Sequence, residues 1–121
     1  MIESALANRA IQNPASDDVY DDGYLRVEHK NYYVAFNGHP IYLPRTEFLL
    51  ISYLVRSVDR VVTAEDLWRY ARDADKPFNP ESLHVFMYRL RRKLLPYRVQ
   101  IDTVVNVGYK LVVSADNGSP S

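Results

Sequence analysis

The residues best suited to binding a ligand are four cationic side chains that lie close together. No acidic residue occurs from position 82 to position 98, and within this stretch the cluster consists of Arg89, Arg91, Arg92 and Lys93. Such side chains neutralise phosphate, and an arginine also donates two hydrogen bonds to the edge of a guanine. Two interpretations are open: the solvated face of an amphipathic helix, and a recognition helix in the major groove of DNA.

The surrounding sequence predicts one helix over residues 80–95. Asn79 is a suitable N-cap, and Pro80 would occupy the first helical position, where no N–H is needed. Apolar residues recur at helical spacing along one face, at Leu83, Phe86, Met87, Leu90 and Leu94. The other face carries the cationic cluster together with Glu81, Val85 and Tyr88. The helix is therefore expected to bury one side and to present the cluster to solvent.

The net charge of the 121-residue chain is zero, but its charges are unevenly distributed. Residues 1–23 hold one base and five acids, whereas residues 24–121 hold 14 bases and 10 acids. A local cationic excess favours association with a polyanion even when the total charge is zero. The absence of cysteine excludes disulfides and thiolate metal sites. No apolar run approaches the ~18 residues that span a bilayer, so we expect a soluble, cytoplasmic protein without a membrane partner.

The remaining sequence predicts a small sheet, two further helices and a hairpin. Strands are expected over 25–28, 32–36 and 41–43, with Asn37-Gly38 as a type I′ turn. Helices are expected over residues 45–57, and over 64–72 with Leu67, Tyr70 and Ala71 buried. Strands over 99–104 and 109–113 would form a hairpin around residues 105–108, where Asn106 and Gly108 tolerate positive φ. Together these elements give an α+β winged helix-turn-helix fold, with residues 99–113 as the wing.

The folded domain is expected to cover residues 24–113. Residues 1–23 are interpreted as a short helix over Ile2–Ile11 followed by an acidic linker over residues 15–23, and residues 114–121 as a tail. The linker contains Asp17, Asp18, Asp21 and Asp22, which are interpreted as solvated side chains and not as a metal or phosphorylation site.

With these motifs identified, the chain resembles the DNA-binding domain of OmpR/PhoB-type response regulators. The resemblance covers residues 25–113 and rests on residues 37–38, 41–43, 47–50, 60–67, 88–94 and 101–109. The R-L-R-x-K-L segment that starts at Arg89, followed by the T-V-x-x-x-G-Y pattern that starts at Thr103, is quite specific. It implies that residues 80–95 enter the major groove, that the wing reaches the minor groove or the backbone, and that two copies bind tandem half-sites of double-stranded DNA. It also implies that residues 1–23 could be the end of a receiver domain and its linker, although a stand-alone regulator stays open.

The resemblance further implies roles for individual residues. Base contacts fall on Val85, Tyr88 and Arg89, of which Val85 could contact a thymine methyl group. Phosphate contacts fall on Arg72, Ser82, Arg91, Arg92 and Lys93. In the wing, the residues implied to contact DNA are Val105, Asn106 and Lys110. Contact with RNA polymerase would involve the loop that contains Asp73, Asp75, Lys76 and Phe78.

Departures from the family pattern keep a second function open. Glu81 stands where an arginine is frequent and would repel phosphate, and Val105 stands where an arginine often enters the minor groove. The alternative is a winged helix that mainly binds protein, either a second copy or RNA polymerase, with weak or non-specific binding of DNA. The histidines show no ligand spacing, and a phosphate loop and a nucleophile motif are both missing. We therefore expect neither an enzyme nor a cofactor or metal.

Overall fold

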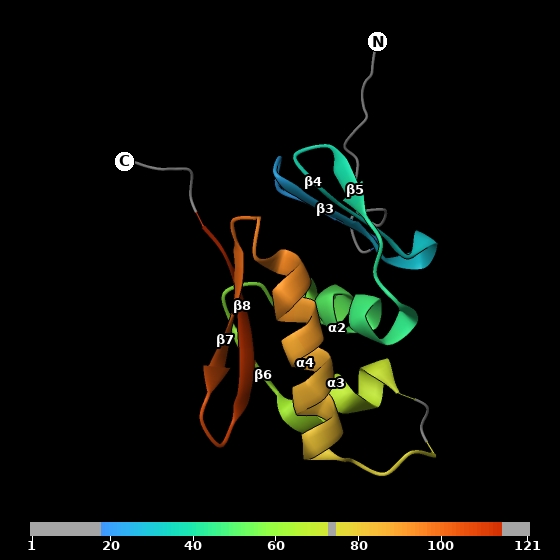
Figure 1. Cartoon of the computed structure of the whole chain (residues 1–121), viewed down its shortest axis with the longest axis vertical. Coiled ribbons are helices and arrows are strands. Elements are labelled where there is room, and N and C mark those ends of the chain that lie inside the picture. Colours follow the sequence, from blue (N-terminus) through green and yellow to red (C-terminus); the bar gives the residue numbers. More distant parts are fainter. Residues whose placement is uncertain (1–17, 73–74, 115–121) are drawn as a thin grey trace. The chain divides into compact units, whose positions relative to one another are not determined.

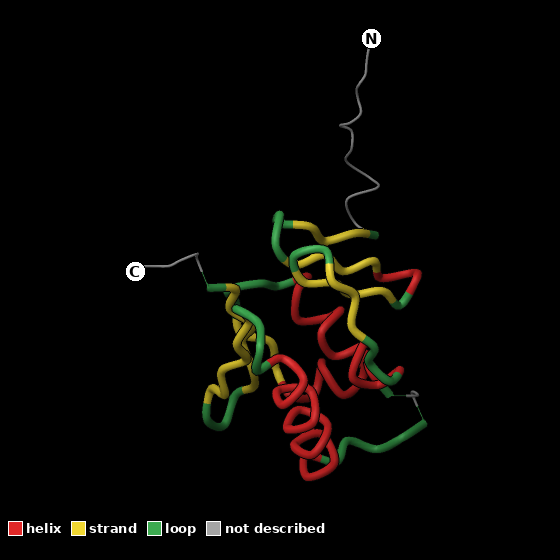
Figure 2. Tube along the Cα trace, turned by 45° about the horizontal axis from the view of Figure 1, so that its top comes forward, coloured by secondary structure: helices red, strands yellow, loops and turns green. Residues whose placement is uncertain are grey.

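The computed structural model describes residues 18–72 and 75–114, in which the chain forms two compact units (Figures 1 and 2). The first unit ends at Tyr42 and the second begins at Leu43. The helix expected over Ile2–Ile11 and, apart from Ser114, the tail expected over residues 114–121 lie outside the described residues. Within the described ranges, no helix is long and apolar enough to cross a membrane.

The first unit is a four-stranded antiparallel sheet in the order β2-β3-β4-β5. Its elements are β2 (Val19–Asp21), β3 (Leu25–Glu28), the 3₁₀ helix η1 (His29–Asn31), β4 (Tyr33–Phe36) and β5 (His39–Ile41). The turn between β4 and β5 has φ of 50° at Asn37 and 84° at Gly38. Positive φ at both central residues is what a type I′ turn requires, so the turn predicted from Asn-Gly is confirmed.

The acidic linker interpretation is wrong for Val19–Asp21, which form β2 and pair with β3. The Asp22 carboxylate accepts hydrogen bonds from the backbone N–H groups of Tyr24 and Leu25, at 2.9 and 2.8 Å. Asp21 pairs with Arg26, with 2.8 Å between carboxylate oxygen and guanidinium nitrogen. Aspartate side chains can thus close a tight turn by accepting backbone N–H groups, which the sequence interpretation treated as a sign of solvation.

The second unit contains three helices and a three-stranded sheet in the order β6-β8-β7. Its elements are α2 (Arg45–Arg56), β6 (Val61–Thr63), α3 (Ala64–Ala71), α4 (Pro80–Leu94), β7 (Val99–Val104) and β8 (Gly108–Val113). Helix α4 packs against α2, α3 and β7, and β7 and β8 form the hairpin expected as the wing (Figure 1). The winged helix-turn-helix arrangement is confirmed.

Side-chain caps explain where α3 and α4 begin. Asn79 Oδ1 accepts from the N–H of Ser82 at 3.0 Å, so the predicted N-cap of α4 is confirmed, and Thr63 Oγ1 caps α3 by accepting from the N–H of Asp66 at 3.1 Å. The predicted burial of Tyr70 is wrong, because its side chain is 37% exposed. The Tyr70 ring lies beside Tyr53, with 4.9 Å between ring centroids.

The turn of the wing depends on one positive φ and one close approach. Asn106 has φ of 66°, which Asn tolerates better than most residues. Gly108 does not have a positive φ, contrary to the expectation from its sequence position; it is the first residue of β8. A Cβ atom at Gly108 would overlap with the carbonyl oxygen of Val62 in β6. Glycine at this position therefore allows β6 and β8 to pair closely.

Candidate nucleic-acid interface

The outer face of α4 presents the residues predicted to read DNA. The centre of this face consists of residues three or four positions apart, which are Glu81, Val85, Tyr88 and Arg92. His84 and Arg89 lie beside them, one on each side. All six side chains are exposed. On the opposite side the apolar residues Leu83, Met87, Leu90 and Leu94 are at most 2% exposed. This burial fixes which side of α4 is available to a ligand.

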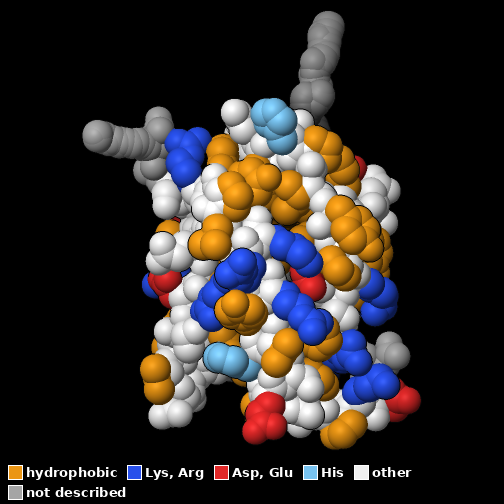
Figure 3. All heavy atoms as spheres, viewed as in Figure 1, with side chains coloured by type: hydrophobic (Ala, Val, Ile, Leu, Met, Phe, Trp, Pro, Cys, Tyr) orange, Lys and Arg blue, Asp and Glu red, His pale blue; other side chains and the backbone are white. Residues whose placement is uncertain are grey.

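The charge of this surface is less uniform than the sequence suggests. Figure 3 shows lysine and arginine side chains over α4 intermixed with hydrophobic ones. The guanidinium of Arg92 lies over the ring of Tyr88, 5.9 Å from its centroid. Arg89 makes no hydrogen bond or ion pair within the described residues. Both guanidinium groups therefore remain available to phosphates or to base edges.

Arg91 is directed toward the wing. Its Nε donates to the carbonyl oxygen of Ile101 at 3.0 Å, and its Nη2 donates to Thr103 Oγ1 at 2.6 Å. Its guanidinium also lies 5.6 Å from the ring centroid of Tyr109 in β8. Arg91 thus connects α4 to both strands of the wing. A phosphate contact, as expected from the sequence, would compete with these interactions.

Lys93 is paired with a buried carboxylate. Its Nζ lies 2.5 Å from Oε1 of Glu47 in α2, and the Glu47 side chain is only 4% exposed. A buried carboxylate is costly without a cation, so this pair holds Lys93 against α2. Sequence reasoning missed this role of Glu47. The signal was present, because Glu47, Leu50, Ile51 and Leu54 share one helical face, and a single acid on an apolar face needs a partner.

Arg72 lies at the end of α3 and was also expected to contact phosphate. Like Arg91 and Lys93, it makes contacts within the domain. Its guanidinium lies between two rings, 5.7 Å from the centroid of Trp68 and 5.3 Å from that of Phe86. Its Nη1 donates to Thr46 Oγ1 at 3.1 Å, and its Nε is buried without a hydrogen-bond partner among the described residues. Arg72 therefore packs between α2, α3 and α4. Ser82, expected beside the phosphates, is half-buried in the first turn of α4.

The wing ends in an apolar tip. Val105 is 76% exposed and Val107 is 50% exposed, with Asn106 exposed between them, whereas Lys110 is half-buried within β8. A valine side chain has no hydrogen-bond donor, so Val105 and Val107 cannot recognise the acceptors of the minor groove. The hydrogen-bonding capacity of the tip therefore depends on Asn106 and on the backbone.

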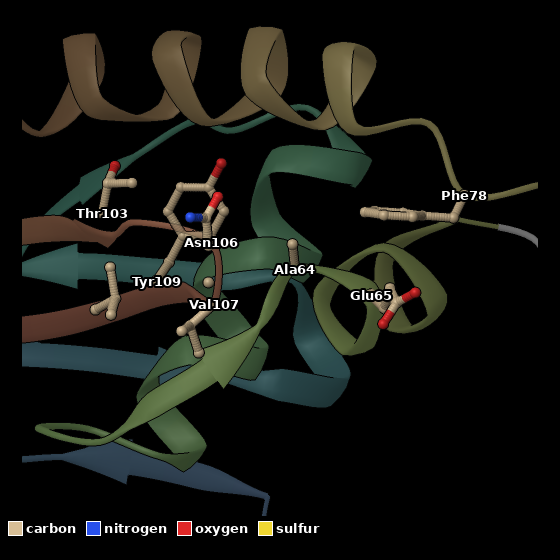
Figure 4. Close-up of a pocket in the computed structure, with 9 residues that line it drawn as sticks. Ala64, Glu65, Phe78, Thr103, Asn106, Val107 and Tyr109 are labelled. Atoms are coloured by element: carbon tan, nitrogen blue, oxygen red, sulfur yellow. The ribbon is translucent and has the colours of Figure 1, made fainter.

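A groove of about 280 Å³ separates the wing from the loop before α4. Figure 4 shows the ring of Phe78 on one side of this groove and the side chains of Asn106, Val107 and Tyr109 on the other. Asp75, Lys76 and Phe78 are exposed, while Asp73 lies outside the described residues. The Lys76 carbonyl oxygen accepts from Trp68 Nε1 at 3.2 Å, which attaches the loop to α3. No three potential metal ligands come together among the described residues.

Three helices, a wing from β7 and β8 and an exposed, partly cationic face on α4 define a winged helix-turn-helix domain. The family described as "Transcriptional regulatory protein, C terminal" matches residues 38–111. The chain belongs to this family, which confirms the family predicted from the sequence.

Curated relatives include sensory transduction protein RegX3 of Mycolicibacterium smegmatis, 37% identical over 100 residues. That match covers 80% of this chain and 44% of the relative. Transcriptional regulatory protein TctD of Salmonella typhimurium is 30% identical over 85 residues, which cover 70% of this chain and 38% of the relative. The chain thus spans about half or less of the length of these relatives.

Solved structures with the same fold include the response regulator DrrB of Thermotoga maritima, an OmpR/PhoB homolog. It is 28% identical with a TM-score of 0.65, and the match covers 78% of this chain and 44% of DrrB. The RstA DNA-binding domain of Klebsiella pneumoniae, solved in complex with the RstA box, is 26% identical with a TM-score of 0.62. In that comparison 79% of this chain and 98% of the RstA domain are covered.

Proposed function

We propose that the chain binds double-stranded DNA in a sequence-specific manner, as the effector domain of a two-component-type transcriptional regulator. Helix α4 would enter the major groove, and the wing would reach the minor groove or the backbone. The observation that carries this proposal is the outer face of α4, which exposes Arg89 and Arg92 while the opposite face is buried. The similar RstA DNA-binding domain was solved in complex with the RstA box, which supports DNA binding by a domain of this fold.

The contacts within the chain indicate which of its cations would contact DNA and which would stabilise the domain. Arg89 would donate to a base, since a bidentate arginine contact to guanine is the commonest specific contact in the major groove. Arg92 would bind phosphate. Arg91 and Lys93 would act inside the domain instead, because Arg91 already donates two hydrogen bonds to the wing and Lys93 is paired with Glu47. At the wing, Asn106 and Lys110 would supply the polar contacts.

The wider proposal concerns the native protein and its partners. The DNA-binding domain would extend from β2 through residue 113, since Val19–Asp21 belong to the first sheet. A second copy would occupy a tandem half-site, and exposed Asp75, Lys76 and Phe78 would be available to RNA polymerase. The domain would act without catalysis or a cofactor, in the cytoplasm.

The first test is selection of bound duplexes from a random DNA pool at moderate salt, followed by sequencing. Recovery of a motif, in two half-sites about one helical turn apart, is the expected result. Recovery without any enriched sequence would contradict sequence-specific binding.

A winged helix that mainly binds protein is the second candidate. Glu81 at the centre of the outer face of α4 repels phosphate, and the valines at the wing tip offer apolar surface. The dependence of binding on salt separates the two candidates. Phosphate contacts lower log K by about 0.9 per contact for each unit of log salt, whereas a mainly apolar protein interface responds weakly.

A further inference from the structure

We propose that Arg72 is a positioning residue, which holds the recognition helix α4 at the angle that sequence-specific binding requires. This role depends on the DNA binding proposed above, and it replaces the phosphate contact that was expected of Arg72 from the sequence. Arg72 acts through Phe86 in α4 and Thr46 in α2, without contacting DNA itself.

The connection between α3 and α4 is too long to fix the angle between the two helices. Helix α3 ends at Ala71 and α4 begins at Pro80, whereas the turn of a helix-turn-helix motif usually has about three to four residues. The two helices also contact each other less than each of them contacts α2. The angle of α4 therefore depends on the side chains that join these helices.

Arg72 contacts all three helices of the second unit. It directly follows α3, and its guanidinium lies 5.7 Å from the ring centroid of Trp68 in that helix. The same guanidinium lies 5.3 Å from the ring centroid of Phe86 in α4, and its Nη1 donates to Thr46 Oγ1 in α2 at 3.1 Å. A guanidinium is flat and has donors in fixed directions, so it constrains the ring on its face and the acceptor at its edge at the same time. A rotation of α4 relative to α2 would break one of these contacts.

Packing alone does not favour an arginine at this site. The Nε of Arg72 is buried without a hydrogen-bond partner among the residues that the structure describes. A buried donor without a partner costs free energy, and an apolar side chain would avoid that cost. What Arg72 adds is a directed hydrogen bond to Thr46 and a cationic face against two rings, and both are orienting contacts.

Phe86 transmits this constraint to the outer face of α4. It lies three positions before Arg89, the residue proposed to contact a base, and residues at this spacing are neighbours on a helix. A hydrogen bond to a base edge requires a donor–acceptor distance of about 2.7–3.2 Å, so a small displacement of α4 breaks it. Contacts to phosphate carry no direct sequence information. A misplaced α4 should therefore lose specificity before it loses its general attraction to DNA.

Substitutions at both ends of the hydrogen bond between Arg72 and Thr46 test this role. Arg72→Lys keeps the charge but lacks the flat face and the directed donors of a guanidinium. Thr46→Val keeps the shape of the side chain and removes the acceptor, whereas the matched control Thr46→Ser retains the hydroxyl. Fluorescence anisotropy, well below the unfolding temperature of each variant, would give affinities for a selected duplex and for a scrambled duplex over a range of salt concentrations.

Arg72→Lys and Thr46→Val should each reduce the preference for the selected duplex over the scrambled one. The expected reduction is at least about fivefold, which corresponds to the loss of one bidentate base contact. The salt slope should match that of wild type, because no phosphate contact is removed. Thr46→Ser should retain both the preference and the slope.

Residual dipolar couplings of the backbone N–H groups measure the same effect without DNA, because they report the orientation of α4 relative to α2 and α3 in the free protein. This orientation should change in Arg72→Lys and in Thr46→Val, and it should be retained in Thr46→Ser. A purely stabilising role of Arg72 would lower the unfolding temperature and leave the orientation unchanged.

Two results would overturn the positioning role while leaving DNA binding intact. One is an unchanged orientation of α4 in both Arg72→Lys and Thr46→Val. The other is wild-type preference in Arg72→Lys together with a salt slope reduced by about one in Arg72→Met, which would show that Arg72 contacts a phosphate. Failure to enrich any duplex would instead contradict the proposed function itself, and the dipolar couplings would still test the role of Arg72 in orienting α4.

Discussion

The four neighbouring cations of α4 illustrate how differently similar residues are used. Arg91 donates to β7, and Lys93 pairs with Glu47 in α2. Arg92 lies over Tyr88, and Arg89 makes no hydrogen bond or ion pair within the described part of the chain. Because Arg91 and Lys93 are already held by partners within the domain, Arg92 and Arg89 are the better candidates for contact with DNA.

Arg89→Ala and Arg92→Ala should therefore weaken DNA binding in different ways. Loss of a bidentate contact to guanine by Arg89→Ala should cost about 1–3 kcal/mol and relax specificity at one base pair. Arg92→Ala should weaken binding to all sequences alike and reduce the salt slope by about one. Anisotropy titrations with matched and single-mismatch duplexes would measure both effects. Wild-type affinity in both variants would rule out this use of the outer face of α4.

Lys93→Ala should destabilise the second unit without changing the salt slope of DNA binding. The buried Glu47 carboxylate would lose its cation, at a cost of about 1–3 kcal/mol. Urea unfolding followed by the fluorescence of Trp68, the only tryptophan, would report on this unit. The double variant Glu47→Leu with Lys93→Met is the control and should recover stability, since an apolar pair needs no counter-ion. A smaller salt slope in Lys93→Ala would mean that Lys93 contacts a phosphate after all.

At the scale of elements, Arg91 couples the recognition helix to the wing. Arg91→Ala should lose two hydrogen bonds, destabilise the domain by about 1–3 kcal/mol and speed amide hydrogen exchange in β7 and β8. Arg91→Lys should recover only part of this, because an ammonium group cannot reproduce the two directed donors of a guanidinium. Unchanged exchange in the wing of Arg91→Ala would show that the coupling is energetically unimportant.

The elements themselves were largely predictable from local sequence. The apolar periodicity and caps of α4, the Asn-Gly turn and the hairpin of the wing each depend on residues close together in the chain. The partners of the charged side chains were not predictable in this way, because Lys93 pairs with a residue 46 positions away and Arg91 with residues 10 and 12 positions away. Strand β2 was missed because its acidic neighbours suggested a linker.

For the whole molecule, the zero net charge and the few unpaired cations of α4 predict a modest dependence of DNA binding on salt. If two to four phosphates are contacted per domain, the slope of log K against log salt should be about −2 to −4. Titrations of one half-site duplex over a range of salt concentrations would measure this slope. A much steeper slope would mean that Arg91, Lys93 or Arg72 leaves its intramolecular partners on binding.

The most direct test of which arginines contact DNA is NMR observation of the arginine Nε–H groups during titration with a selected duplex. Signals of Arg89 and Arg92 should shift as DNA is added, since both face outward from α4. The signal of Arg91 should change little, because its Nε donates to Ile101. Shifts at Arg91 with unchanged signals at Arg89 and Arg92 would contradict the account of the interface.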